Sequence, residues 1–279
     1  MEETPVSTAL AVFHGAYGRA ALYRLNRPLA PHAHREGHLL FLVKGAASRI
    51  IINGESHRID PGQAVTINPW EPHEFRPGCV SEGSVLLTLY ITPHWMRDMS
   101  SNGPWDLHFG DTTIPVDGEL RRLVTFVSNL LADGHTRNGF AELLFELILA
   151  GFEKSWPAST TPGQRHSQRV SDFRIRNAIK LMNERVTDEC VLDVIARDAG
   201  LSRPHFYKLF RQNIGLTPNM YLNTLRLERS IQRLTLSDDP VTAIGLDLGF
   251  ASQASFTRFF SNNIGMSPTD YRRASVVAN

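Results

Sequence analysis

Four histidines near the N-terminus are the residues best suited to chemistry. His32 and His34 are separated by one residue, and His38 follows shortly after. In an extended chain alternate side chains point the same way, so His32 and His34 share one face. His73 lies in a second, proline-containing segment. Because imidazoles are good ligands for Zn, Ni, Fe or Cu, these four histidines form a candidate site for a divalent transition metal.

The same two segments also carry aromatic residues, which favours a small organic ligand over a metal. A ligand site combines aromatic surface with a few polar groups. The histidines would then line a polar pocket mouth or pack inside the domain, and the aromatic residues could be ordinary core. We therefore expect no cofactor, with a bound metal as the less favoured alternative. The candidate ligand wall consists of His34, His38, Phe41, Trp70, His73 and Phe75.

A second kind of chemistry lies in the C-terminal part, where a pattern of aromatic residues and glycines occurs twice. Corresponding positions are 50 residues apart from Phe206 and Phe256 onward, and 49 apart at Gly200 and Gly249. The second copy therefore has one extra residue in its turn. Two copies indicate duplicated helical units, because a solenoid needs three or more.

Each copy has the pattern of a helix-turn-helix. A short apolar-striped segment (193–199 or 241–248) ends at a glycine, which ends a helix at little cost. Ser202 or Ser252 then precedes a second helix and can cap it. In this motif the second helix enters the major groove of DNA.

Helical phase separates the two faces of each second helix. Phe206, Leu209 and Phe210 share the core face in the first copy, and Phe256, Phe259 and Phe260 share it in the second. Polar donors on the opposite face suit direct reading of base edges, although any surface helix has a solvated face. The candidate DNA-binding residues are Ser202, Arg203, Pro204, Tyr207, Lys208, Arg211, Ser252, Gln253, Ala254, Thr257, Arg258 and Ser261.

The elements that would position the histidines read as short strands. Residues 48–52 and 55–59 flank Asn53-Gly54, a strong signal for a two-residue hairpin turn. Residues 39–43, 64–67 and 85–91 are further strands, separated by glycine and proline turns. Such spacing predicts a small β-barrel or jelly roll.

Helices follow the strands. A short helix is expected over 93–99, and apolar stripes predict helices over 118–131 and 139–156. These two helices could cap the barrel or form a dimer interface. Residues 157–164 have the composition of a linker. We therefore expect a sensor domain over 1–156, a linker over 157–170 and an all-helical domain over 171–279, giving an α+β multidomain chain.

Composition excludes several classes of protein. Of the 279 residues, 42% are hydrophobic and 20% are charged, which is typical of globular proteins. No apolar run is long enough to span a bilayer. Cys79 and Cys190 are too few for a disulfide framework and read as buried thiols, so we expect a cytoplasmic protein. From residue 165 onward basic residues exceed acidic ones by five, which suits contact with phosphates.

The C-terminal domain resembles the DNA-binding domain of the AraC/XylS family of transcriptional regulators. This resemblance implies seven helices, with a long helix over about 218–234 joining the two units, and base-reading residues at the outward positions named above. Pro204 departs from the family, which often has a larger or polar residue there, so the first unit leans more on phosphates. The residues that carry the resemblance are Gly249, Phe250, Phe256, Arg258, Phe259, Phe260, Gly265, Pro268, Tyr271 and Arg272.

Residues 20–92 resemble the cupin fold, which often forms the effector domain of such regulators. Cupin enzymes hold a metal through three histidines and a carboxylate, and here His38 stands where a glutamate often lies. We expect a regulator that binds double-stranded DNA under the control of a small-molecule effector, contacts RNA polymerase, can form a homodimer and touches no membrane. No catalytic motif indicates an enzyme. The alternatives are a cupin metalloenzyme with a DNA-binding tail and a ligand-independent DNA-binding protein whose barrel only dimerises.

Overall fold

The computed structural model describes residues 7–99, 107–134, 139–156, 172–187 and 191–277. The chain forms two compact units, residues 1–166 with 261–279 and residues 167–260. The expected linker over 157–170 lies outside the described residues. The sequence places 261–279 in the C-terminal domain, whereas compactness groups them with the first unit. The predicted domain boundaries therefore stay a prediction.

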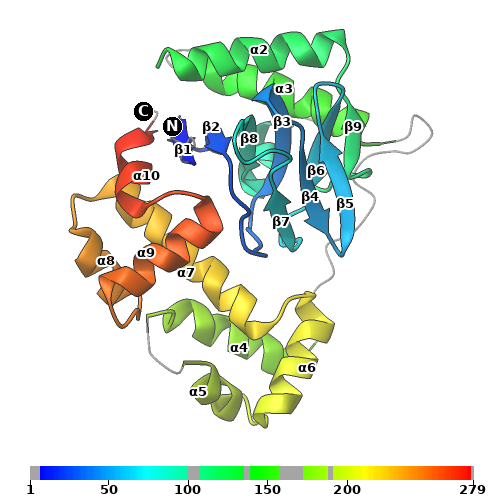
Figure 1. The fold of residues 1–279 in the computed structure, drawn as a ribbon. Coiled ribbons are helices and arrows are strands. Elements are labelled where there is room, and N and C mark those ends of the chain that lie inside the picture. The colour runs from blue at the N-terminus through cyan, green and yellow to red at the C-terminus, as the bar shows by residue number, and fades with distance from the viewer. Residues whose placement is uncertain (1–6, 100–106, 135–138, 157–171, 188–190, 278–279) are drawn as a thin grey trace. The chain divides into compact units, whose positions relative to one another are not determined.

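Two β-sheets build the first unit (Figure 1). The larger sheet has the strand order β10-β1-β2-β8-β3-β6-β9, and the smaller has the order β5-β4-β7. Most neighbouring strands are antiparallel, and β10 pairs with β1 in parallel. The strands are β1 (Thr8–Gly15), β2 (Gly18–Leu25), β3 (Gly37–Gly45), β4 (Ser48–Ile52), β5 (Glu55–Ile59), β6 (Gln63–Ile67), β7 (His73–Arg76), β8 (Ser84–Ile91), β9 (Thr113–Pro115) and β10 (Ser275–Val277).

The five strands expected from the sequence are present within two residues of their expected ends. The hairpin turn is also confirmed, because Asn53 and Gly54 have φ values of 52° and 85°. These are the left-handed conformations that such a turn requires.

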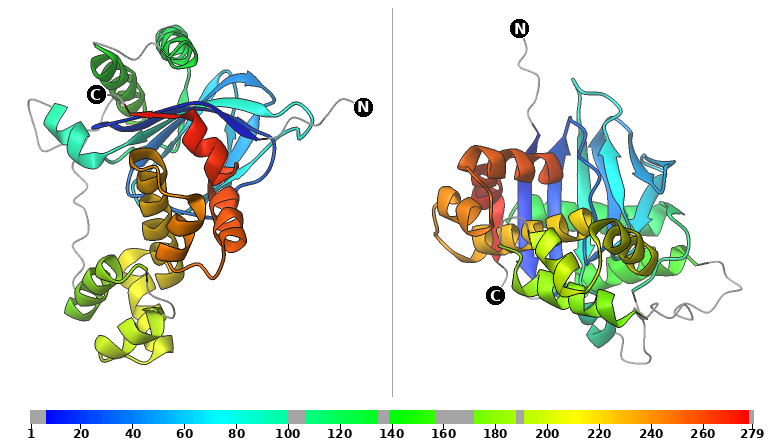
Figure 2. Two further views of the ribbon diagram at one scale, coloured as in Figure 1. Left: turned by 90° about the vertical axis from the view of Figure 1, so that its left-hand side faces the viewer. Right: turned by 90° about the horizontal axis from the view of Figure 1, so that it is seen from below.

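Two helices cover one face of the larger sheet, as Figures 1 and 2 show. They are α2 (Gly118–Ala132) and α3 (Phe140–Lys154), and the short helix α1 (Pro93–Met99) precedes them. Their apolar stripes pack with the sheet side chains Leu39, Leu87 and Leu89 in one core. The stripes therefore cap the sheet, which was one of the two alternatives left open by the sequence.

The second unit is helical. Its helices are α4 (Phe173–Glu184), α5 (Val191–Asp198), α6 (Arg203–Ile214), α7 (Pro218–Leu236) and α8 (Val241–Asp247), with most of α9 (Gln253–Ile264). With α10 (Pro268–Ala274), seven helices occupy the described residues after 172, as the family resemblance implies. The long helix α7 extends two residues beyond its expected end.

Among the described residues, no helix is long and apolar enough to cross a membrane. The expectation of two buried thiols is corrected at Cys79, which is a free and only half-buried cysteine. Cys190 lies outside the described residues.

Candidate functional site

The first helix-turn-helix consists of α5, the turn at Gly200 and α6. Gly200 has a φ of 66°, so it takes the left-handed conformation expected of a residue that ends a helix. Ser202 stands at the N-cap of α6, but its side chain makes no capping hydrogen bond, which corrects the expected cap. Instead, the Arg203 guanidinium bonds the Asp193 carboxylate of α5 at 3.2 Å.

The second helix-turn-helix consists of α8, the turn at Gly249 and α9. Here the expected cap is present, since the Ser252 hydroxyl accepts a hydrogen bond from the backbone N–H of Ser255 at 3.1 Å. The first residue of α9 is again tied to the preceding helix, because the Thr242 hydroxyl donates to the Gln253 side-chain oxygen. Both copies therefore brace the start of the second helix against the first.

The outward faces of α6 and α9 present most of the expected DNA-binding residues to solvent. On α6 the half-buried exception is Tyr207, whose hydroxyl is buried without a hydrogen-bond partner in the described structure. On α9 Thr257 and Ser261 are half-buried, and the Ser261 hydroxyl donates to the Met266 carbonyl. The exposed members are Ser202, Arg203, Pro204, Lys208, Arg211, Ser252, Gln253, Ala254 and Arg258.

Two exposed polar residues on α6 were missed by the sequence analysis, namely His205 and Gln212. Gln212 lies one turn beyond Lys208, on the same side of the helix. Helical phase was sufficient to find it, had the outward face been followed to the end of the helix.

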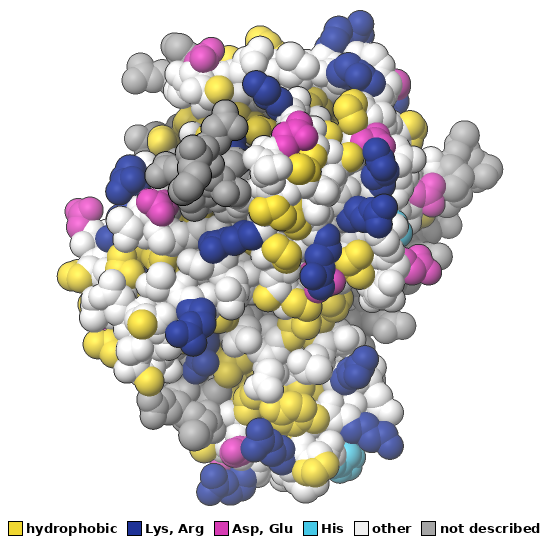
Figure 3. Space-filling view, in the orientation of Figure 1, with side chains coloured by type: hydrophobic (Ala, Val, Ile, Leu, Met, Phe, Trp, Pro, Cys, Tyr) yellow, Lys and Arg dark blue, Asp and Glu magenta, His cyan; other side chains and the backbone are white. Residues whose placement is uncertain are grey.

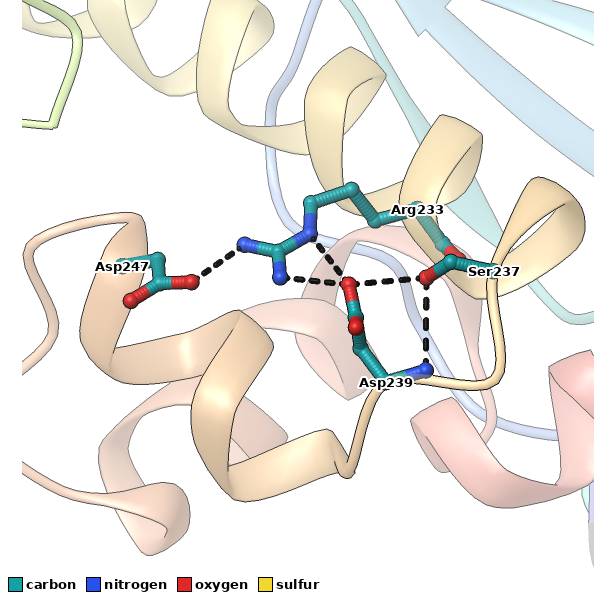
Figure 4. Close-up of polar contacts among 4 residues, drawn as sticks. All are labelled: Arg233, Ser237, Asp239 and Asp247. Atoms are coloured by element: carbon teal, nitrogen blue, oxygen red, sulfur yellow. Dashed lines mark hydrogen bonds and ion pairs between the residues drawn. The ribbon is translucent and has the colours of Figure 1, made fainter.

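Helix α7 braces both helix-turn-helix units through a stripe of arginines. Arg226 donates to the Val186 carbonyl and Arg229 to the Asn183 carbonyl, both at the end of α4. Arg233 bonds Asp239 at 2.6 Å and Asp247 of α8 at 2.7 Å (Figure 4). These contacts raise the pKa of Arg233. Helix α7 therefore contacts both helix-turn-helix units, from its middle and from its last turn, and we expect it to set the spacing between them.

The two helix-turn-helix units also touch at a turn. A Cβ on Gly249 would lie 2.5 Å from the Thr187 carbonyl oxygen, which is closer than any side chain allows. The turn of the second helix-turn-helix unit therefore lies against the backbone that follows α4. This contact and the arginines of α7 hold the two helix-turn-helix units together.

The four histidines come together between the two sheets of the first unit. His38 belongs to β3 of the larger sheet and His73 to β7 of the smaller, and their ring centroids are 5.0 Å apart. His32 lies beside both His34 and His73, at 4.7 and 4.5 Å. Ligand nitrogens of His32, His34 and His73 all lie within 4.8 Å of one another. All four side chains are buried.

The hydrogen bonds of this cluster leave one ring nitrogen of each histidine available. Nδ1 of His32 lies 2.7 Å from the Ala30 carbonyl, and Nδ1 of His73 lies 2.8 Å from the Glu71 carbonyl. Donation to these carbonyls places the proton on Nδ1 and leaves the Nε2 lone pair free. Nε2 of His34 and of His38 is buried without a partner in the described residues. At His32 and His73 a carbonyl lies behind the ring, as is found around metal-binding histidines, so these residues fit a metal.

Burial keeps these rings neutral. Desolvation lowers the pKa of His32 to about 4 and that of His73 to about 3, and it lowers the pKa of His34 and His38 well below the usual value. Neighbouring charges add to the effect, with His38 acting on His34 and His73 acting on His38. A neutral imidazole is the form that binds a metal or accepts a hydrogen bond.

The aromatic residues of the expected ligand wall divide into three groups. Phe75 lies two residues after His73 on β7, so both side chains are on the same side of the strand, where both are buried. Trp70 is half-buried and has a φ of 64°, a strained conformation for a bulky residue, while its N–H donates to the His34 carbonyl. Phe41 must be corrected, because it lies in the core under α2 and α3, on the opposite face of β3 from His38.

Two further residues line the histidine cluster and were missed. Tyr90 of β8 packs on His38 with ring centroids 4.3 Å apart, and the guanidinium of Arg19 lies 3.7 Å above the Tyr90 ring. Arg19, Tyr90 and His38 occupy paired positions on three neighbouring strands. The alternation of β8 could have indicated Tyr90, but the pairing of β2 with β8 is not readable from the sequence.

Two family models match the chain. A helix-turn-helix domain matches residues 195–274, and a cupin domain matches residues 27–97. The first match covers the turns and the second helices of both copies. The second covers the four histidines.

Relatives match over nearly the whole length. The HTH-type transcriptional activator RhaS of Escherichia fergusonii is 25% identical over 261 residues, or 90% of each chain. The probable transcriptional regulator LumQ of Photobacterium leiognathi is 22% identical, over 89% of this chain and 94% of its own. The solved structure of ToxT from Vibrio cholerae O395 has a TM-score of 0.59 at 14% identity, over 91% of this chain and 96% of its own.

The ToxT similarity shows a shared fold, and the domain matches show which parts of that fold are present. A cupin domain lies N-terminal to a duplicated helix-turn-helix, as the two resemblances in the sequence imply. The chain therefore combines an N-terminal cupin domain with a helix-turn-helix domain, and over nearly its whole length it is similar to HTH-type transcriptional activators such as RhaS.

Proposed function

We propose that the outward faces of α6 and α9 read two successive segments of the DNA major groove. The observation that carries this proposal is the repeated geometry. In both copies the second helix is braced at its first residue and presents exposed polar side chains. Because α7 holds both units, the two helices would engage one asymmetric site, with major-groove segments about 34 Å apart.

Selection from a pool of random DNA duplexes tests this proposal. The full chain should enrich one asymmetric sequence with two conserved blocks about 10 base pairs apart, centre to centre. A variant lacking charge on α6, with Lys208→Ala and Arg211→Ala, should weaken selection in one block only. Enrichment of no sequence, or of a single short block, would overturn the proposal.

We further propose that the barrel receives the signal. ToxT has been solved with an unsaturated fatty acid bound, at a TM-score of 0.56 and 13% identity, and with an aromatic butenoic acid bound. In this chain the proposed effector site is the cluster of His34, His38 and His73 with Phe75. A screen of small molecules by thermal shift tests it, since a true effector raises the melting temperature of the native chain. His38→Ala should abolish that rise.

A metal ion is the second candidate for the signal, and the histidine geometry favours it. The neighbouring imidazole rings lie 4.5 to 5.5 Å apart and are buried, and Nε2 of His34 and of His38 lacks a partner within the described residues. His32, His34 and His73 would hold a divalent transition metal, with His38 beside them. The ion would supply positive charge and fix the orientation of the rings.

Elemental analysis of the purified protein distinguishes these candidates. A metal signal predicts about one Fe, Ni, Cu or Zn per chain, lost in His32→Ala but retained in His57→Ala. His57 serves as the control because it lies on β5, outside the cluster. A metal-free protein that still responds to a small molecule would exclude the metal.

The proposal includes no catalytic step, because the relatives are named as transcriptional regulators. Homodimer formation and contact with RNA polymerase stay predictions. If no compound or ion stabilised the barrel, the ligand-independent alternative would replace effector control.

A further inference from the structure

Three arginines form a row across the exposed face of the smaller sheet. Arg49 lies on the central strand β4 and pairs directly with Arg58 of β5 and Arg76 of β7. Directly opposite residues in a sheet are close neighbours, with Cβ atoms about 5 Å apart. Figure 3 shows Lys and Arg side chains gathered over this part of the first unit. We call these three residues the arginine row.

The arginine row lines a hollow of about 590 Å³. Such a volume is within the range of small-molecule sites, about 300–1,000 Å³. Ser56 and Ile51 are also among the residues that line it. At one end the segment after β7 runs against the residues just before β4, because Gly78 has no side chain and passes close to the Ala47 carbonyl. The hollow is therefore a feature of the folded sheet.

The charges of the row are only partly balanced. Arg58 bonds Asp60 at 2.7 Å and Arg76 bonds Glu74 at 2.9 Å, each within its own strand region. Arg49, between them, has no ion pair or hydrogen bond from its side chain among the described residues. Like charges placed opposite each other destabilise a sheet, so the row costs stability unless an anion lies on it.

We propose that the arginine row binds a small hydroxylated molecule bearing one oxyanion, either a phosphoryl group or a carboxylate. The oxyanion would lie on Arg49, since a guanidinium binds both groups through paired hydrogen bonds. Ser56, which lines the hollow, would exchange hydrogen bonds with a hydroxyl of the ligand. The two carboxylates flanking the row would repel a continuous phosphate backbone, which favours a small ligand over DNA.

Calorimetric titration of the full chain with glucose 6-phosphate, gluconate and glucose tests the proposal. One or both anionic probes should bind, which identifies the phosphoryl or carboxylate source, and glucose should not. Arg49→Gln should weaken binding at least about tenfold, because it removes a charge-assisted contact. Arg122→Gln on α2 removes the same charge elsewhere and should leave binding unchanged.

A second readout needs no ligand. Arg49→Gln should keep or raise the melting temperature of the free protein, because it removes repulsion from Arg58 and Arg76. A fall in melting temperature would identify Arg49 as an ordinary structural residue and overturn the proposal. Absence of binding up to ~10 mM of either anionic probe would also overturn it. So would weaker binding of operator DNA by Arg49→Gln, which would assign the row to the DNA backbone.

Discussion

Arg258 is the residue whose role in DNA binding can be tested most cleanly. Its side chain is exposed on the outward face of α9, and it forms no ion pair within the described structure. It lies one turn from Ala254, whose small side chain lets a base edge approach the helix. An arginine in this position can bond guanine through two hydrogen bonds.

Arg258→Ala should therefore reduce affinity for the selected site by about 1–3 kcal/mol and relax the preference at one base position. Competition binding against duplexes with single base changes measures both effects. Arg122→Ala, on α2 of the first unit, is the control for loss of positive charge. An equal loss of affinity for every duplex would make Arg258 a phosphate contact.

For the histidine site, the sequence could predict which residues lie close together. It could predict only partly to which side of a strand each side chain points. The four histidines were predicted correctly as a group, because alternation on a strand and a second histidine segment require only local pattern. Phe41 was wrong for a local reason, since a residue three positions from His38 on a strand must point to the other face. Arg19 was unpredictable, because its burial depends on how distant strands pair.

The orientation of α6 and α9 relative to the helices before them depends on the turns at Gly200 and Gly249. Gly200 and Gly249 both have positive φ, at 66° and 79°. Open space surrounds Gly200, whereas Gly249 approaches the Thr187 carbonyl. The two glycines thus separate the cost of the backbone conformation from the cost of a clash.

Gly200→Ala should lower the free energy of unfolding by about 1 kcal/mol, the cost of a left-handed alanine. Gly249→Ala should cost about 3 kcal/mol, because the new methyl group also displaces the backbone near Thr187. Urea unfolding followed by circular dichroism measures both. Equal costs for the two variants would show that the contact between the units does not hold in solution.

The ion pairs of α7 permit a similar comparison. Arg233 bonds two carboxylates and its side chain is 29% exposed, whereas Arg185 bonds one carboxylate within the described residues, that of Asp198, and its side chain is 38% exposed. Arg233→Ala should lower stability by about 1 kcal/mol, and Arg185→Ala by about half as much, since exposed single pairs contribute little. Added salt should reduce both effects. A larger loss for Arg185→Ala would contradict the bracing role of Arg233.

Helix positions were predicted well because their signals are local. Apolar stripes, turn glycines and the repeat gave each expected helix, usually within two residues of its ends. Ser202 and Ser252 occupy the same place in the repeated pattern. The sequence therefore could not show that the side-chain cap is missing at Ser202. Sheet order was beyond the sequence, because β8 lies between β2 and β3 through pairings distant along the chain.

At the scale of the whole molecule, the chain joins two kinds of recognition. The cupin domain holds four neutral histidines between two sheets, and α7 contacts both helix-turn-helix units. We propose that α6 and α9 read DNA as one body. In the alternative arrangement, one helix would read DNA and the other would be a structural copy.

Hydroxyl-radical footprinting of the full chain on its selected site tests that claim most directly, with each helix altered in turn. We expect two protected segments about one helical turn apart, on one face of the duplex. Lys208→Ala with Arg211→Ala should weaken one segment, and Arg258→Ala the other. A single protected segment, or loss of the same segment in both variants, would show that α6 and α9 do not read two segments of DNA together.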